Sequence, residues 1–102
     1  MIHVLATIEV KPGQRDAFLA EFKNLVPKVR AEKGCIEYAP TVDVASGLGV
    51  QPEVRSDVVV VVEKWTDLSA LHAHTHAPHM IEFRSKVKDL QTGLTLHVTH
   101  PA

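Results

Sequence analysis

The feature that most limits the fold of this chain is a run of five consecutive valines, Val58 to Val62. Valine is β-branched and favours strands, and a strand that is apolar at every position is typically buried on both faces. We therefore predict a strand from Val58 to Trp65. The fold has to provide cover for both faces of the sheet that contains it.

Three more strands are predicted around this one. Apolar and polar residues alternate in the segments Ile2 to Val10 and Leu94 to Val98, which is typical of strands with one buried face. A weaker alternation predicts another strand from Cys35 to Val44, and the segment Ala45 to Asp57 forms a long connection. Long connections in compact domains are usually functional or mobile.

Helices are predicted between the strands from apolar residues spaced three and four apart. The first contains Pro27, so we expect a kink near Asn24 to Val26. Its apolar face consists of Phe18, Phe22, Leu25 and Val29. The second helical region begins at Thr66 or Asp67 and breaks at Pro78, and its second piece is predicted to end at Thr92 or Gly93. The core stripe of that piece consists of Met80, Phe83, Val87 and Leu90.

The order of these elements predicts a single α+β domain over residues 1–102, with a βαββαβ order. A four-stranded antiparallel sheet with both helices on one face is the ferredoxin-like arrangement. The helices cover only one face, and no element is left for the other. A second copy of the sheet is the simplest cover for the valine strand, which predicts a homodimer. The alternative is a central strand whose second face is apolar but uncovered.

Composition excludes several classes of protein. The formal net charge is -1 and the basic residues do not cluster, which disfavours nucleic acid as a partner. Cys35 is the only cysteine, no basic and apolar leader is present, and no apolar run is long enough to cross a membrane. We expect a cytoplasmic protein. The sequence also lacks a glycine-rich phosphate loop, so we expect no flavin, nicotinamide or nucleotide cofactor.

Histidine is concentrated in one short segment that contains His72, His74, His76 and His79. His72 and His76 are four residues apart and would share a helix face, so both could reach a metal ion if a third ligand joined them. Solvated histidines on a helix are the simpler interpretation. His79 lies beside the helix break and could direct a neutral imidazole between helix and sheet, where it would suit the uptake of a phenolic proton. A histidine bonded to the start of its own helix is the alternative.

Three residues near the strands also stand out. Trp65 and Tyr38 are expected to pack in the core, and the hydroxyl group of Tyr38 would need a partner. Glu63 is the one acidic residue near the end of the valine strand. It could be a buried base, an acid at a dimer interface or a residue that faces solvent.

Several short stretches occur in a characteristic order along the chain. They are Val10-Lys11-Pro12-Gly13, Phe18, Arg30 to Cys35 with Tyr38, Glu63-Lys64-Trp65, Ala73-His74 and Ala77 to Met80. Their order and spacing resemble the antibiotic biosynthesis monooxygenase (ABM) domain family over nearly the whole chain. Tyr38-Ala39-Pro40 and the long connection look most like the bacterial quinol monooxygenases of that family.

This resemblance implies a dimeric α+β barrel in which two sheets pair face to face. It also implies cofactor-independent oxygenation of small aromatic quinols or polyphenols, in which a base deprotonates the substrate and the anion passes an electron to O2. Trp65, His74 and His79 occupy recurring positions of the family and are the candidate catalytic residues, with Trp65 as a pocket wall and His79 as the preferred base. Tyr38, Met80 and Phe83 are the candidate substrate-binding residues.

Two other functions remain open. The chain could be a dimeric protein that binds a small molecule without turnover, or a metal-binding domain built on the histidine cluster. We expect no metal ligands at the substrate site. Haem degradation is disfavoured because that branch of the family has an asparagine on the first strand, where this chain has Ala6 or Thr7.

Overall fold

The computed structural model describes residues 1–102 and contains four strands and three helices. The strands are β1 (Ile2–Val10), β2 (Cys35–Thr41), β3 (Val58–Trp65) and β4 (Gln91–Thr99). The helices are α1 (Arg15–Arg30), α2 (Leu68–Thr75) and α3 (Pro78–Val87). The predicted order of elements is confirmed, including the break of the second helical region at Pro78. No helix of the chain has the length and apolar character needed to cross a membrane.

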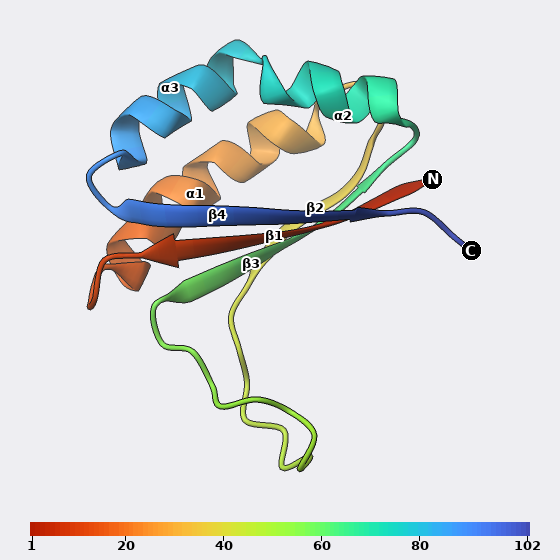
Figure 1. The fold of residues 1–102 in the computed structure, drawn as a ribbon. Coiled ribbons are helices and arrows are strands. Elements are labelled where there is room, and N and C mark those ends of the chain that lie inside the picture. The colour runs from red at the N-terminus through yellow and green to blue at the C-terminus, as the bar shows by residue number, and fades with distance from the viewer.

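The sheet is antiparallel throughout, with the strand order β2-β3-β1-β4, so the valine strand and β1 are central. Figure 1 shows all three helices on one face of this sheet, which is the predicted ferredoxin-like arrangement. The connection between β2 and β3 projects from the opposite face.

Local signals explain most helix ends. The Asp67 side chain accepts a hydrogen bond from the Ala70 backbone N–H at 2.8 Å and caps α2, as predicted. Pro78 occupies the first turn of α3, where a missing N–H costs no helical hydrogen bond. The first helix runs through Pro27 as one element.

Two predicted boundaries were wrong. The second strand ends at Thr41 instead of Val44, because the chain then leaves β3. The third helix ends at Val87, before Leu90, and the predicted stop residues Thr92 and Gly93 belong to β4. Pairing with β1 extends β4 back to Gln91, so Thr92 and Gly93 belong to this edge strand of the sheet.

The core lies between the sheet and α1. Phe22 stacks on Tyr38 with ring centroids 5.6 Å apart and meets the edge of Phe83 at the same distance. Val59 and Val61 of the valine strand point into this layer and are fully buried. The helix face predicted from Phe18, Phe22, Leu25 and Val29 is buried as expected.

The opposite face of the sheet has no cover within the chain. Val60 and Val62 lie on that face and are half-buried, and Leu5, which pairs with Val62, is 47% exposed. Burial of the valine strand is therefore complete on the helix face only. The second copy that is predicted to cover this face lies outside the single chain.

Residues 42–57 form an extended segment, here called the arm, that projects from the uncovered face (Figure 1). Arg55 holds its two sides together with hydrogen bonds to both carboxylate oxygens of Asp43, at 2.9 and 3.0 Å. Nearer the tip, Gln51 bonds to Ser46 and to the Val44 carbonyl. The arm is thus internally bonded, although several of its apolar side chains are exposed. These are Val42, Val44, Leu48, Val50 and Val54.

Candidate active site

A cavity of about 180 Å³ lies between the sheet and the helices α2 and α3. Most of its lining is apolar, and it extends to the edge strand β4, where Leu94 and Leu96 are about half exposed. The remaining apolar lining residues are Val4, Ala6, Ile8, Phe22, Tyr38, Val61, Leu71, Met80 and Phe83. The polar lining residues are Glu63, His74, Thr75, Arg84 and Gln91. A cavity with apolar walls and a few polar groups is typical of a small-molecule site.

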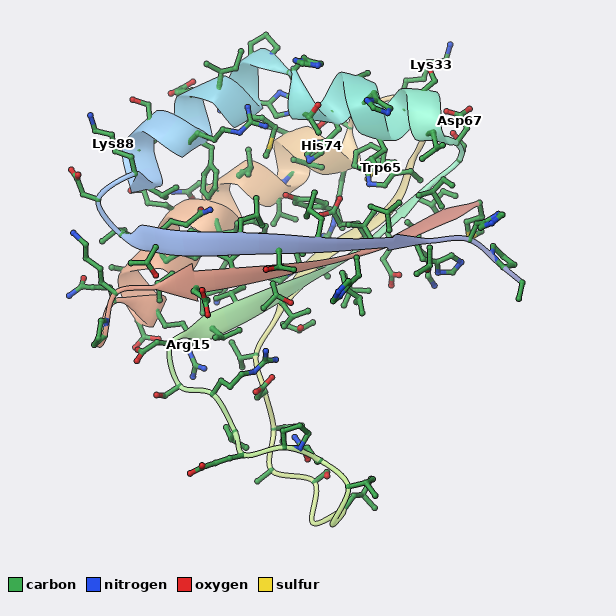
Figure 2. All side chains as sticks on the ribbon, viewed as in Figure 1. Arg15, Lys33, Trp65, Asp67, His74 and Lys88 are labelled. Carbon is green, nitrogen blue, oxygen red and sulfur yellow. The ribbon has the colours of Figure 1, made fainter.

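His74 is the imidazole of this cavity. Figure 2 shows it projecting from α2 toward the sheet, next to Trp65. Its ring is buried, with its centroid 4.8 Å from that of Trp65 and 5.4 Å from that of Tyr38. These two aromatic rings fix the orientation of the imidazole. His74 Nδ1 lies 2.9 Å from Oε2 of Glu32.

Burial lowers the pKa of His74, against the effect of the Glu32 carboxylate, which raises it. A neutral imidazole that donates its Nδ1–H to a carboxylate keeps the lone pair of Nε2 as a proton acceptor. In this arrangement Nε2 of His74 can accept a proton, and the Glu32 carboxylate would stabilise the imidazolium that forms.

Glu63 is a carboxyl group on the wall of the same cavity, and it is only 5% exposed. It accepts a hydrogen bond from Nε1 of Trp65 at 2.9 Å. Burial raises the pKa of Glu63 to about 7, although the Trp65 hydrogen bond opposes this shift. Burial also raises the pKa of Tyr38, which keeps its phenol group protonated.

Glu32 is brought to the site by the turn that follows α1. The backbone of this turn is held by hydrogen bonds from Glu32 N–H to the Val29 carbonyl and from Cys35 N–H to the Glu32 carbonyl. Gly34 has φ +85° and packs so closely against α2 that an added Cβ would lie 2.6 Å from Cβ of Ala70. Only glycine meets both requirements. The turn therefore fixes Glu32 next to α2.

The same Oε2 atom of Glu32 also binds Nε2 of His79, at 2.7 Å. His79 lies in the first turn of α3 and does not line the cavity. Its ring borders a smaller hollow of about 30 Å³ on the surface between α1 and α3. The structure thus places His79 outside the cavity, and the Glu32 carboxylate connects it to His74.

The six predicted site residues divide into three groups. Tyr38, His74, Met80 and Phe83 line the cavity, Trp65 lies behind His74 and Glu63, and His79 contacts Glu32. Glu32 was missed, because it meets histidines 42 and 47 residues away and no local pattern marks it. Glu63 had a signal, since it is the acidic residue of an otherwise apolar strand.

The other two histidines of the cluster, His72 and His76, are exposed. No group of three or more His, Cys, Asp or Glu side chains is arranged to hold a metal ion. The third ligand that a metal site on His72 and His76 would need is not provided by the fold.

Comparison with known proteins agrees with this architecture. The sequence profile described as "Antibiotic biosynthesis monooxygenase" matches residues 1–86. The chain is 37% identical to the "Probable quinol monooxygenase YgiN" of Escherichia coli K12 over 103 aligned positions, which cover 99% of this chain and 98% of that protein.

Solved structures are similar over the whole chain. The crystal structure of PA3566 from Pseudomonas aeruginosa has a TM-score of 0.82 at 26% identity, covering 99% of this chain and 93% of that one. Protein SO0527 from Shewanella oneidensis has a TM-score of 0.79 at 25% identity and covers 98% and 89%.

Proposed function

The chain belongs to the antibiotic biosynthesis monooxygenase family, and on this premise we propose that it is a cofactor-independent monooxygenase or oxidase of small aromatic quinols or polyphenols. The observation that carries the proposal is a buried imidazole, His74, held by a carboxylate on the wall of an apolar cavity. The description of the Escherichia coli relative as a probable quinol monooxygenase supports quinols as the substrate class.

The cavity suits an aromatic substrate in size and in chemistry. Its volume of about 180 Å³ exceeds the roughly 150 Å³ of an engineered apolar cavity that binds benzene. The rings of Phe22 and Phe83 and the thioether of Met80 offer apolar contacts, while Tyr38 and Glu63 offer hydrogen bonds to a second hydroxyl group. One or two fused rings with hydroxyl groups are the ligands that this lining favours.

In the proposed reaction, Nε2 of His74 takes the proton of a substrate hydroxyl group, and the Glu32 carboxylate stabilises the imidazolium that forms. The electron-rich phenolate then passes one electron to O2, which gives a phenoxyl radical and superoxide. The proposal therefore assigns the role of base to His74 and places His79 behind it.

The substrate supplies every electron in either outcome. Recombination at a ring carbon followed by loss of water inserts one oxygen atom and gives a quinone. Transfer of a second electron and of both protons to oxygen gives a quinone and hydrogen peroxide. The apolar walls limit access of water to the radical pair.

Oxygen consumption by metal-free protein tests the proposal. With a panel of hydroquinones and naphthols, we expect saturable uptake that survives a chelator and falls roughly 100-fold or more in His74→Ala, because the base is lost. His72→Ala is the matched control, since His72 is exposed on the same helix, and its rate should stay within about twofold of wild type.

An unchanged rate in His74→Ala would contradict the assignment of the base. Aromatic ligands that quench Trp65 fluorescence without oxygen uptake above autoxidation would instead identify a binding protein without turnover. Uptake that requires added metal would favour the histidine cluster.

We also propose that the protein works as a homodimer whose uncovered sheet faces pack together into an α+β barrel. The support is the row of apolar residues across the uncovered face, in which Val62 pairs with Leu5 on one side and with Ala39 on the other. Burial of exposed apolar surface is the main driving force for association.

A further inference from the structure

We propose that Glu32 couples His74 to His79, so that the two imidazoles share one excess proton and proton uptake by one is compensated by proton release from the other. This inference rests on the proposed function, because it describes how the base of that reaction is kept neutral and reset. His79 is then a positioning residue that acts through Glu32, and it does not touch the substrate.

The geometry that carries the inference is the sharing of one oxygen atom. Oε2 of Glu32 lies 2.9 Å from Nδ1 of His74 and 2.7 Å from Nε2 of His79. Both distances are typical of strong hydrogen bonds to a carboxylate. The Glu32 side chain is only 13% exposed, so the interaction of its charge with either ring is weakly screened by water.

The two imidazoles differ in their access to solvent. The His74 side chain is 6% exposed and faces the cavity, whereas that of His79 is 21% exposed and borders the hollow between α1 and α3. A charged ring is favoured where water can solvate it. The shared proton is therefore favoured on the more exposed of the two rings, and the buried His74 is the ring left neutral and ready to accept a proton.

The proton balance of one turnover follows from this arrangement. When Nε2 of His74 takes the substrate proton, two imidazolium ions would face one carboxylate, so His79 releases its Nδ1 proton to solvent. When reduced oxygen takes the proton back from His74, His79 takes one up again. The net charge of the group formed by Glu32, His74 and His79 is the same before and after each step.

Other titratable or charged groups also face these rings, and the test has to account for them. Near His74 these are Glu63 on β3, Tyr38 on β2 and Arg84 on α3, and near His79 they belong to α1 and α3. Those around the hollow are Glu21, Lys28, Glu82 and Lys86. Each of them is unchanged in the variants chosen below.

Histidine titration followed by NMR tests the coupling without any turnover. In His79→Gln we expect the pKa of His74 to rise, because the competing positive charge is removed while Glu32 remains. In Glu32→Gln it should fall, because the carboxylate that favours the imidazolium is lost. His76→Gln, an exposed histidine two residues after His74, should leave the titration of His74 unchanged.

A His74 titration that is the same in His79→Gln and in wild type would overturn the inference. A second measurement uses 4-nitrophenol, which is not oxidised, in weakly buffered solution without oxygen. Wild type should release protons as the bound phenol ionises, whereas His79→Gln should release none. Equal release in both proteins would also overturn the inference.

The two proposals fail in distinguishable ways. Coupled titrations in a protein that consumes no oxygen would reject the proposed oxygenase and retain the shared proton. Turnover that depends on His74, together with uncoupled titrations, would retain the proposed oxygenase and reject the shared proton.

Discussion

Glu63 is a carboxyl group that the fold shields from water. It is 5% exposed, its partner is the Trp65 indole, and the cavity next to it is mostly apolar. Taking a carboxylate out of water is costly, so the protonated form is favoured and its pKa rises to about 7. A neutral carboxyl group can also donate a hydrogen bond to a quinone oxygen.

We predict that Glu63 makes folding stability depend on pH. Its folded pKa of about 7 exceeds its ordinary value of 4.5. Between these values the native state keeps a proton that the unfolded state has released, so the free energy of unfolding falls as the pH rises across this window. The total loss is on the order of 3 kcal/mol.

Urea denaturation of wild type and Glu63→Gln between pH 4.5 and 8 measures this effect. Glutamine keeps an oxygen for the Trp65 N–H, so the difference between the two proteins isolates the ionisation of Glu63. Glu82→Gln, whose side chain is 61% exposed on α3, is the control and should follow the wild-type curve. Parallel curves for wild type and Glu63→Gln would contradict the prediction.

At the residue scale, the sequence predicts the cavity residues better than the network behind them. Phe83 follows from helical phase and Tyr38 from its place in the second predicted strand, whereas His74 is singled out only by the resemblance to the family. The position of His79 depends on the angle between two short helices at Pro78, which no local pattern determines. Glu32 is placed by tertiary contacts of a turn, so its role emerges only in three dimensions.

At the scale of elements, the turn between α1 and β2 sets the geometry of the site. Gly34 accepts a hydrogen bond from Thr66 N–H at 2.9 Å, which ties the turn to the start of the second helical region. The start of α2, which carries His74, and the turn that carries Glu32 are therefore held together at this glycine.

Gly34→Ala should destabilise the protein by at least about 2 kcal/mol, because it combines a positive φ with a close contact to Ala70. Gly13→Ala is the matched control. Gly13 has a similar φ of +78° but no atom within 4 Å of an added Cβ, so strain alone should cost about 1 kcal/mol. Midpoints of urea denaturation check both values, and equal losses would show that the close contact does not matter.

Three of the strands were predictable as elements because their alternation reflects burial on one face, and the valine strand was predictable from its continuous apolar run. Their ends were less so. Thr92 and Gly93 look like a helix stop, but Gly93 pairs with Glu9 next to a register shift in β1. Pairing across the sheet overrides the local preference of these residues, and this pairing is not encoded in the neighbouring sequence.

At the scale of the whole molecule, the arm projects from the face of the sheet that the helices leave uncovered (Figure 1). Exposed apolar patches of this kind are rare on monomeric proteins and mark interaction sites. The valine run indicated from sequence that both faces need cover, and the single chain covers one.

Val62→Lys should convert the proposed homodimer into a monomer, because a charge would replace an apolar side chain at the centre of the uncovered face. Ile81→Lys is the control, since Ile81 is 58% exposed on α3, away from that face. Sedimentation velocity over a range of concentrations measures the outcome. A wild-type monomer, or a Val62→Lys variant that remains dimeric, would contradict this prediction.

The pairing of β1 with β4 brings the two ends of the chain close together. His3, the second residue of β1, pairs with Thr99, the last residue of β4, and both chain ends lie at the same end of the sheet (Figure 1). A short linker could join them, and the chain could be reopened at the tip of the arm near Gly47. Such a circular permutant would keep every strand pair and the group around Glu32, while converting the arm from a connection into two free tails.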